Sequence, residues 1–382
     1  RQARLAAARR EERVRLAPVT PVRDQVAARL KEDPRLVSLE AKKDLLAGYN
    51  ERVLAFGRGI TSSSVRYFDR HTVLRLATSE GTYIEQEKVD LGGSVVAIAS
   101  RDGRTQQVSV GFGSSNDFGV VRGLEEEIDE ACSLATALLE APVVPGGEYT
   151  VILDPILAGV FVHEAFGHLS EADGLHENEN LKEVMKLGRT FGRPILNIYD
   201  SGVDEGARGY LKYDDEGVPA ERTDLIREGK LVGRLHSRET AGRMGERPTG
   251  SARALNYRFP PLVRMRNTCI APGDASFEDL LEGVKDGIYA RGFYGGQTMG
   301  EMFTFTSMVA WRIRDGRLAE LIHNPTLSGN VFATLHEIDA IGRDMGRRDD
   351  GGGCGKGGQS PLPVCHWAPD IRIRRCLVGG RG

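Results

Sequence analysis

The segment from residue 62 to residue 113 restricts the possible folds more than any other part of the chain. It reads SSSVRYFDRHTVLRLATSEGTYIEQEKVDLGGSVVAIASRDGRTQQVSVGFG, in which apolar and polar residues largely alternate. Such alternation is typical of β-strands with one buried face, because successive side chains point to opposite faces of a sheet. The pairs Glu80-Gly81 and Asp102-Gly103 interrupt the pattern and are typical of hairpin turns. We therefore expect an antiparallel meander.

Helical spacing flanks this meander on both sides. Residues 1–50 carry helical apolar patterns broken at two prolines, and residues 123–142 combine such a pattern with an acidic first turn. A capped helix is also expected over residues 276–290, where Ser276 precedes two acidic residues. Most of the remaining C-terminal sequence alternates again between turn residues, as antiparallel strands do.

Helices and antiparallel strands in separate blocks predict an α+β fold. At 382 residues the chain exceeds the usual size of one domain, roughly 100 to 200 residues, so we expect two. We place their boundary near residue 145, which gives an N-terminal α+β domain (1–145) and a C-terminal domain rich in antiparallel strands (146–382). Because the chain begins with Arg1 rather than Met, we expect the natural N-terminus to lie upstream or to have been processed.

The charge pattern argues against a nucleic-acid or membrane partner. The formal net charge is −3, and no run of 18 or more apolar residues occurs. The basic stretch at residues 1–18 is interrupted by Glu11 and Glu12, and we interpret it as a solvated amphipathic helix. The five cysteines are an odd set without the framework of a small secreted domain, so reduced thiols are expected. A cytoplasmic protein follows from these features.

The stretch VHEAFGHL places His163 and Glu164 side by side and a second histidine, His168, five positions after the first. In the familiar helical zinc-peptidase motif the two histidines are four positions apart and share one face. A spacing of five separates two helical side chains by about 140°. Such rings cannot both bind one zinc ion unless the helix is distorted between them. Gly167 is where a departure in backbone angles costs least, so we expect a bulge or unwinding there.

From the residues alone, two interpretations of this stretch stay open. His163 and His168 could be separate, satisfied histidines on an otherwise apolar core helix. The carboxylate of Glu164 requires a partner or a purpose on such a helix, and beside a zinc-bound water it could act as a general base. A catalytic zinc also needs a third protein ligand. The local candidates that follow the motif are Glu171, with Asp173, His176 and Glu177 in reserve.

The other candidate ligand is Cys354, which lies far downstream between glycines in DDGGGCGKGGQS. A flexible surface loop is the plain interpretation of that segment. A phosphate-binding P-loop is excluded by spacing, because it requires glycine where Asp350 stands and Ser or Thr where Gly357 stands. A thiolate among glycines suits metal binding, since the backbone can approach an ion closely.

Six blocks of the sequence resemble the TldD/PmbA family of bacterial and archaeal metallopeptidases. In chain order they are HEAFGHLSEAD, DDEGVPAERTDLIREGKLVG, VRMRNTCIAPG, GIYARGFYGGQ, LIHNPTLSGNVFATLHEIDAIGRD and CGKGGQSPLPV. The resemblance implies an α+β fold whose C-terminal part is the metallopeptidase domain. It implies a metal held by His163, His168 and Cys354, with Glu164 as the general base. Cys354 is thereby favoured over Glu171 as the third ligand.

The resemblance also implies a reaction and partners. The intact motif is similar to the TldD-like, catalytic branch of the family, whereas the PmbA-like branch lacks it. Such proteins digest unfolded or small peptides as dimers, often with one chain from each branch. We therefore expect a peptidase with one Zn²⁺ per active chain, as a homodimer or as a heterodimer with a PmbA-like chain. A thiolate with two imidazoles favours zinc.

Some residues stay unassigned. The candidates for a donor that stabilises the substrate carbonyl are His176, His236 and Tyr294. The family pattern does not account for Cys365, His366 and Cys376, which we expect to be ordinary strand residues. Residues before about 50 resemble the family weakly, so the first domain is expected to be incomplete or divergent. Two alternatives remain: a non-catalytic regulatory partner, such as a gyrase modulator, and a structural zinc closed by Glu171 or His366.

Overall fold

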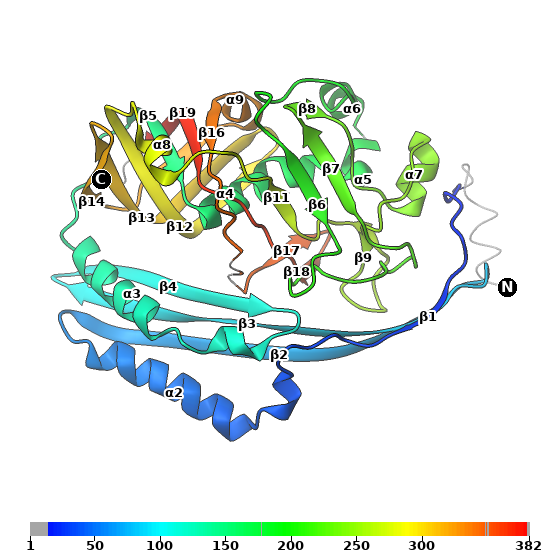
Figure 1. Cartoon of the computed structure of the whole chain (residues 1–382), viewed down its shortest axis with the longest axis horizontal. Coiled ribbons are helices and arrows are strands. Elements are labelled where there is room, and N and C mark those ends of the chain that lie inside the picture. Colours follow the sequence, from blue (N-terminus) through cyan, green and yellow to red (C-terminus); the bar gives the residue numbers. More distant parts are fainter. Residues whose placement is uncertain (1–13, 177, 348, 350, 380–382) are drawn as a thin grey trace.

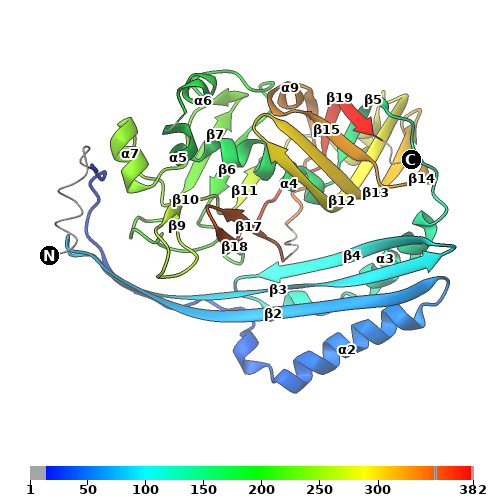
Figure 2. The same ribbon diagram turned by 180° about the vertical axis from the view of Figure 1, so that it is seen from behind.

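The computed structural model describes residues 14–176, 178–347, 349 and 351–379 (Figure 1). The helix expected at the start of the chain and the reserve ligand Glu177 fall wholly or partly outside these residues. Helices and largely antiparallel sheets occupy separate parts of the chain, as Figure 1 and the reverse view in Figure 2 show, so the predicted α+β class is confirmed. No helix within the described residues is both long and apolar enough to cross a bilayer.

The N-terminal part is built on the expected meander. Strands β2 (Ile60–Ala77), β3 (Tyr83–Arg101) and β4 (Arg104–Ser114) pair antiparallel in chain order. The turn between β3 and β4 has positive φ at Asp102 and Gly103, 50° and 77°, which suits a tight hairpin. The apolar faces of α2 (Leu39–Ala55) and α3 (Glu125–Leu138) bury one face of this sheet in a shared core.

One N-terminal prediction is wrong. Part of the segment expected to be helical forms strand β1 (Arg23–Val26), which pairs in parallel with Tyr83–Gln86 of β3. The edge of a long strand offers unpaired backbone groups. Hydrogen bonding to that edge therefore outweighs the weak helical pattern of the segment.

The C-terminal part contains a larger sheet. Strands β12 (Asp286–Met299), β5 (Gly147–Leu153), β19 (Ile371–Gly379), β15 (Thr326–Asn330) and β13 (Met302–Arg314) follow one another across it, and β12 also pairs with β13. This last pairing closes the five strands into a ring. Strand β14 (Arg317–Ile322) pairs antiparallel with β13, and β16 (Ile338–Ile341) pairs antiparallel with β19.

A smaller sheet and several short elements complete the C-terminal part. The small sheet has the order β11 (Thr268–Ile270), β6 (Ile198–Ser201), β7 (Arg222–Arg227) and β8 (Lys230–Leu231). Two-residue strands β9 (Ala252–Arg253) and β10 (Leu262–Val263) pair beside it, and β17 (Gly353–Lys356) forms a hairpin with β18 (Gln359–Pro363). The short helices are α5 (Ala172–His176), α6 (Glu179–Val184), α7 (Arg238–Met244), α8 (Phe277–Leu281) and α9 (Val331–His336).

The helix expected over residues 276–290 is correct only at its start. Ser276 accepts a hydrogen bond from the backbone of Asp279, as an N-cap does, but α8 ends at Leu281. Gly283 then takes a φ of +76° and the chain enters β12. The expected domain boundary near residue 145 falls between α3 and β5. This boundary stays a prediction. The two parts share packing contacts across it, since Val309 of β13 lies within the N-terminal core.

Candidate metal centre

The His-Glu motif lies at the end of a buried apolar helix. Helix α4 (Pro155–Val162) is capped by Asp154, whose carboxylate accepts a hydrogen bond of 2.8 Å from the backbone of Leu157. From His163 to Gly167 the helix continues as a π-turn, in which the backbone N–H of His168 donates to the carbonyl of His163. A π-turn closes with this i→i+5 hydrogen bond, whereas an α-turn closes with i→i+4. The expected distortion is therefore present, and the two rings lie with their centroids 5.3 Å apart.

The reason expected for Gly167 is wrong. Its backbone angles, φ −58° and ψ −50°, are ordinary helical values that any residue adopts. Glycine is required by packing instead, because a Cβ at this position would lie 2.0 Å from Sδ of the buried Met265. The widened turn therefore rests directly against the Met265 side chain.

Three side chains converge beyond this turn. One ligand atom each of His163, His168 and Cys354 lies within 4.8 Å of the others, and no other such group of His, Cys, Asp or Glu occurs among the described residues. Cys354 comes from β17, and its Sγ lies 3.3 Å from Nε2 of His168. Ligand atoms around a tetrahedral zinc are roughly 3.3 to 3.8 Å apart, given bonds of about 2.0 to 2.3 Å. The cluster needs only small adjustments to accept such an ion.

The state of His163 fits a metal ligand. The side chain is buried, with 4% of the residue exposed, and its Nδ1 has no hydrogen-bond partner within the described part of the chain. Burial lowers the pKa of His163 well below its usual range, which favours the neutral ring that a metal requires. Two imidazoles and a thiolate are a donor set that suits zinc.

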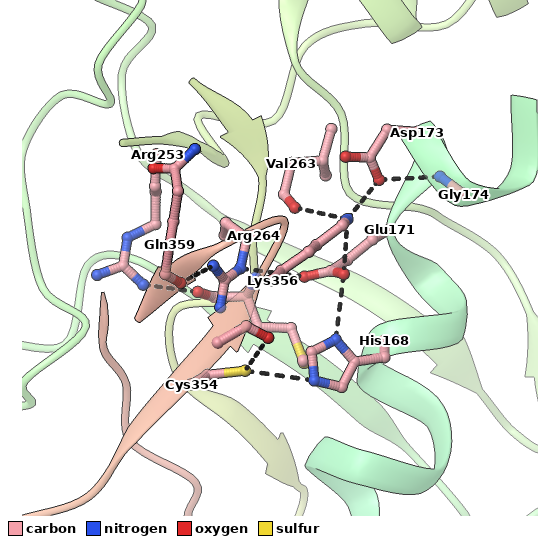
Figure 3. Close-up of polar contacts among 12 residues, drawn as sticks. His168, Glu171, Asp173, Gly174, Arg253, Val263, Arg264, Cys354, Lys356 and Gln359 are labelled. Atoms are coloured by element: carbon pink, nitrogen blue, oxygen red, sulfur yellow. Dashed lines mark hydrogen bonds and ion pairs between the residues drawn. The ribbon is translucent and has the colours of Figure 1, made fainter. Parts of the chain in front are cut away.

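Glu171 lies on the other side of His168 from Cys354, as Figure 3 shows. Its Oε2 is 3.1 Å from Nδ1 of His168 and 2.9 Å from Nζ of Lys356, and its Oε1 accepts a hydrogen bond of 3.3 Å from the backbone of Met265. A carboxylate in this place fixes the orientation of a metal-binding imidazole and leaves Nε2 facing the ion. Glu171, the ligand favoured by local sequence, is placed to orient His168.

The charges at this pair are strongly coupled. Burial lowers the pKa of His168, but its hydrogen bonds with Cys354 and Glu171 outweigh that effect and raise the pKa to about 10. Burial raises the pKa of Glu171. The hydrogen bond from His168 and the positive charges of His168 and Lys356 have a larger, opposite effect, so the pKa of Glu171 is lower than its usual value. Without a metal, His168 therefore holds a proton that an ion must displace.

Glu164 occupies the open side of the cluster. Its Oε2 lies 3.9 Å from Nε2 of His168, the nitrogen that also faces Cys354, and 33% of its side chain is exposed. A carboxylate that lies near the ligand nitrogen and also contacts solvent is placed to exchange protons with a water molecule beside the ligand cluster.

The structure brings some other candidates near and excludes others. Asp173 lies 2.5 Å from Nζ of Lys356, so it anchors that lysine. His176 does not belong to the ligand cluster. Tyr294 lies on β12 with half of the residue exposed, and the donor role considered for His176 and Tyr294 stays a prediction. His236 is wrong as a donor to substrate, because it is 1% exposed and its two ring nitrogens are 3.1 Å from Thr240 and Glu246.

Sequence reasoning missed two residues of this region. His366, expected to be an ordinary strand residue, has its ring centroid 5.6 Å from that of His163. The main chain at His366 approaches α4 closely, because a Cβ on Gly159 would lie 2.5 Å from the His366 carbonyl oxygen. Lys356 was the other omission, although its position two residues after Cys354 on one strand was a usable signal. Cys376 lies on β19, as expected, whereas Cys365 forms only an isolated bridge with Asn267, and both are buried.

Two family models and several known proteins match this sequence along most of its length. The model described as the PmbA/TldA metallopeptidase C-terminal domain matches residues 146–380, and the central-domain model of the same family matches residues 32–139. A metalloprotease of Synechocystis sp. is 50% identical over 367 residues, which cover 96% of this chain and 79% of the relative. The zinc metalloprotease TldD homolog of Saccharolobus solfataricus is 33% identical over 326 residues, covering 84% and 72%.

Solved structures are similar in fold. A Thermotoga maritima protein described as a candidate modulator of a DNA gyrase has a TM-score of 0.77 at 20% identity, covering 97% of this chain and 81% of that one. TldE from Thermococcus kodakarensis has a TM-score of 0.71 at 16% identity, covering 95% and 80%. At these identities the two structures bear on the fold alone.

Proposed function

This chain belongs to the TldD/PmbA family of metallopeptidases, and we propose that it is a zinc-dependent peptidase of unfolded or small peptides. The observation that carries the proposal is the convergence of His163, His168 and Cys354 beside the partly exposed Glu164. Three protein ligands leave a fourth position of a tetrahedral ion for water or substrate, as catalytic zinc sites require.

In the proposed mechanism, each residue has one task. His163, His168 and Cys354 would hold the ion, and Glu171 keeps Nε2 of His168 directed toward their common centre. When bound, zinc would lower the pKa of a water molecule and polarise the scissile carbonyl. Glu164 accepts the proton of the attacking water and later donates it to the leaving amine. This exchange requires a carboxylate at position 164, which makes the proposal testable at one residue.

The experiment compares Glu164→Gln with Glu183→Gln, a matched change at an exposed glutamate on α6. Cleavage of denatured casein and zinc content are measured for both variants, with and without a chelator. We expect Glu164→Gln to keep about one zinc per chain and to lose activity by about 10²-fold or more. Glu183→Gln should match the unmodified protein. Full cleavage by the Glu164→Gln variant would remove Glu164 from the mechanism.

The alternative is a non-catalytic regulatory protein, such as a gyrase modulator. A binding protein has no need of a partly exposed carboxylate beside its metal ligands, so the position of Glu164 supports the peptidase. Zinc bound in full, but with no chelator-sensitive cleavage of casein, would favour the alternative. A dimer, with a second copy or with a PmbA-like chain, remains part of the proposal, and native mass determination of the purified chain tests it.

A further inference from the structure

Cys354 reaches His168 on a short hairpin between the two halves of the molecule. Figure 1 shows β17 and β18 above the C-terminal end of β4 and the middle of β3, and below the C-terminal sheets. After Cys354, Lys356 is held by Glu171 and Asp173 at 2.9 and 2.5 Å. Before Cys354, Asp349 and Gly351 lie against the N-terminal sheet, and Gly352 accepts a hydrogen bond from Arg208. The cysteine therefore lies between two separate anchors.

The anchor before Cys354 is centred on Arg208, which is 3% exposed. Its Nε donates a hydrogen bond of 2.7 Å to Oδ1 of Asp90 on β3, and its Nη2 donates one of 3.3 Å to Oδ2. Its Nη1 donates to the carbonyl of Gly352 and lies 3.6 Å from Oδ1 of Asp349. One guanidinium thus connects the N-terminal sheet to the backbone two residues before Cys354.

The sheet is shaped to receive this segment. A Cβ on Gly113 of β4 would lie 2.7 Å from both Cδ of Arg208 and Oδ1 of Asp349. A Cβ on Gly92 of β3 would lie 3.0 Å from Cα of Gly351. Gly351 itself has a φ of +74°, which favours glycine. Small residues on both partners therefore let the backbone of the segment lie directly on the sheet.

These contacts do more than join two surfaces. A buried ion pair is weak evidence for stability, because apolar residues of similar volume often serve as well or better. A guanidinium is distinct in its rigid fork of donors, which fixes the relative positions of its acceptors. Here one acceptor is the carboxylate of Asp90 on a strand of the N-terminal half. The other is the backbone carbonyl of Gly352, two residues before Cys354 in the C-terminal half. The arrangement is suited to fixing geometry.

We propose that Asp90 and Arg208 are positioning residues that hold Cys354 at the metal centre. The N-terminal sheet is thereby a part of the catalytic apparatus, although it supplies no metal ligand. This inference rests on the proposed function, because it requires Cys354 to bind the ion. It goes beyond that function by assigning a role to two residues 118 positions apart in different halves of the chain.

The test uses the full chain with Co²⁺ in place of zinc. A cysteine ligand gives Co²⁺ a thiolate-to-metal charge-transfer absorption in the near ultraviolet, so the band reports on Cys354 directly. Asp90→Asn and Arg208→Lys should weaken this band, and zinc affinity measured against a chromophoric chelator should fall about 10- to 100-fold. Arg208→Lys keeps the charge and loses the fork, so it separates geometry from charge.

Two controls separate positioning from general stability. Glu85→Gln removes a carboxylate of the same strand that lies 2.6 Å from Arg75 on the exposed part of the sheet. Val95→Ala creates a cavity in the N-terminal core, so it should lower Tm without changing a residue that contacts the hairpin. Both controls should keep the band and the zinc affinity. Should Arg208→Lys fail to fold, Asp90→Glu, which keeps the charge and displaces the fork by one methylene, is expected to weaken the band instead.

The outcomes are distinct. Bands and affinities of the Asp90 and Arg208 variants equal to those of the controls would overturn the positioning role while leaving the peptidase intact. A normal band in the unmodified protein without peptidase activity would refute the proposed function and leave the positioning role standing. A complete absence of the band in the unmodified protein would overturn both, since Cys354 would then bind no metal.

Discussion

Replacing Glu171 with glutamine removes one charge from the support of the metal centre and changes little in shape. Glu171 is buried and contacts His168 at 3.1 Å, Lys356 at 2.9 Å and Nε of Arg264 at 3.8 Å. Loss of a carboxylate that orients a metal-binding imidazole lowers affinity about 10- to 100-fold. At about 1.4 kcal/mol per tenfold, the change corresponds to about 1.4 to 2.8 kcal/mol of binding free energy. We expect Glu171→Gln to bind zinc more weakly by this amount.

The same change should also destabilise the metal-free protein. Removing one partner of a buried ion pair costs about 3 to 5 kcal/mol, and here the exposed quarter of the Lys356 side chain reduces that cost. Chelator competition gives the affinity, and thermal unfolding with and without zinc gives the stability. Asp173→Asn is the comparison variant, because it removes a charge that pairs with Lys356 and leaves the hydrogen bond between Glu171 and His168 in place, so weaker binding found only in Glu171→Gln is due to His168. Equal zinc affinities for Glu171→Gln and the unmodified protein would refute this account of Glu171.

Two further predictions concern packing and pH. Gly167→Ala should lower Tm and zinc affinity, because its Cβ would overlap Met265, and such overpacking costs about 1 to 3 kcal/mol. The double variant with Met265→Ala should recover part of this loss, whereas strictly additive losses in Tm would contradict the packing argument. Burial raises the pKa of Asp154 to about 6, so folding takes up a proton and this contribution to stability, fully present below pH 4, is lost as pH rises through 6. Asp154→Asn, an equally good N-cap, should therefore raise Tm at pH 7.5 but not at pH 4, and a gain that does not depend on pH would contradict the assignment.

The sequence predicts those parts of the fold that depend on local patterns. The meander from Ile60 to Ser114 alternates along its own length, so its strands and turns can be found without knowledge of the rest. Strand β1 is different, because its pairing with β3 depends on a neighbour some 60 positions away. The helix that begins at Ser276 shows the same limit, since the capping residues are local and the pairing of β12 with β5 and β13 is not.

In the candidate site, too, local features could be predicted from the sequence, whereas features that depend on distant residues could not. The five-residue spacing of His163 and His168 requires a distorted helix, and the π-turn provides it. The reason for Gly167 could not be found from sequence, because it depends on contact with Met265 almost 100 positions later. The residues alone left Cys354 as one candidate ligand beside Glu171, and only the resemblance to a family favoured it, since a glycine-rich segment does not reveal which ion or backbone it approaches. Asp90 and Arg208 lie 118 positions apart and carry no local motif.

X-ray absorption at the zinc edge of the metal-loaded protein tests the central claim most directly. A site formed by His163, His168 and Cys354 predicts one sulfur at about 2.3 Å and light atoms at about 2.0 to 2.1 Å. The sulfur contribution should disappear in Cys354→Ser. A zinc shell without sulfur in the unmodified protein, or a sulfur contribution that persists in Cys354→Ser, would contradict the assignment of this metal centre.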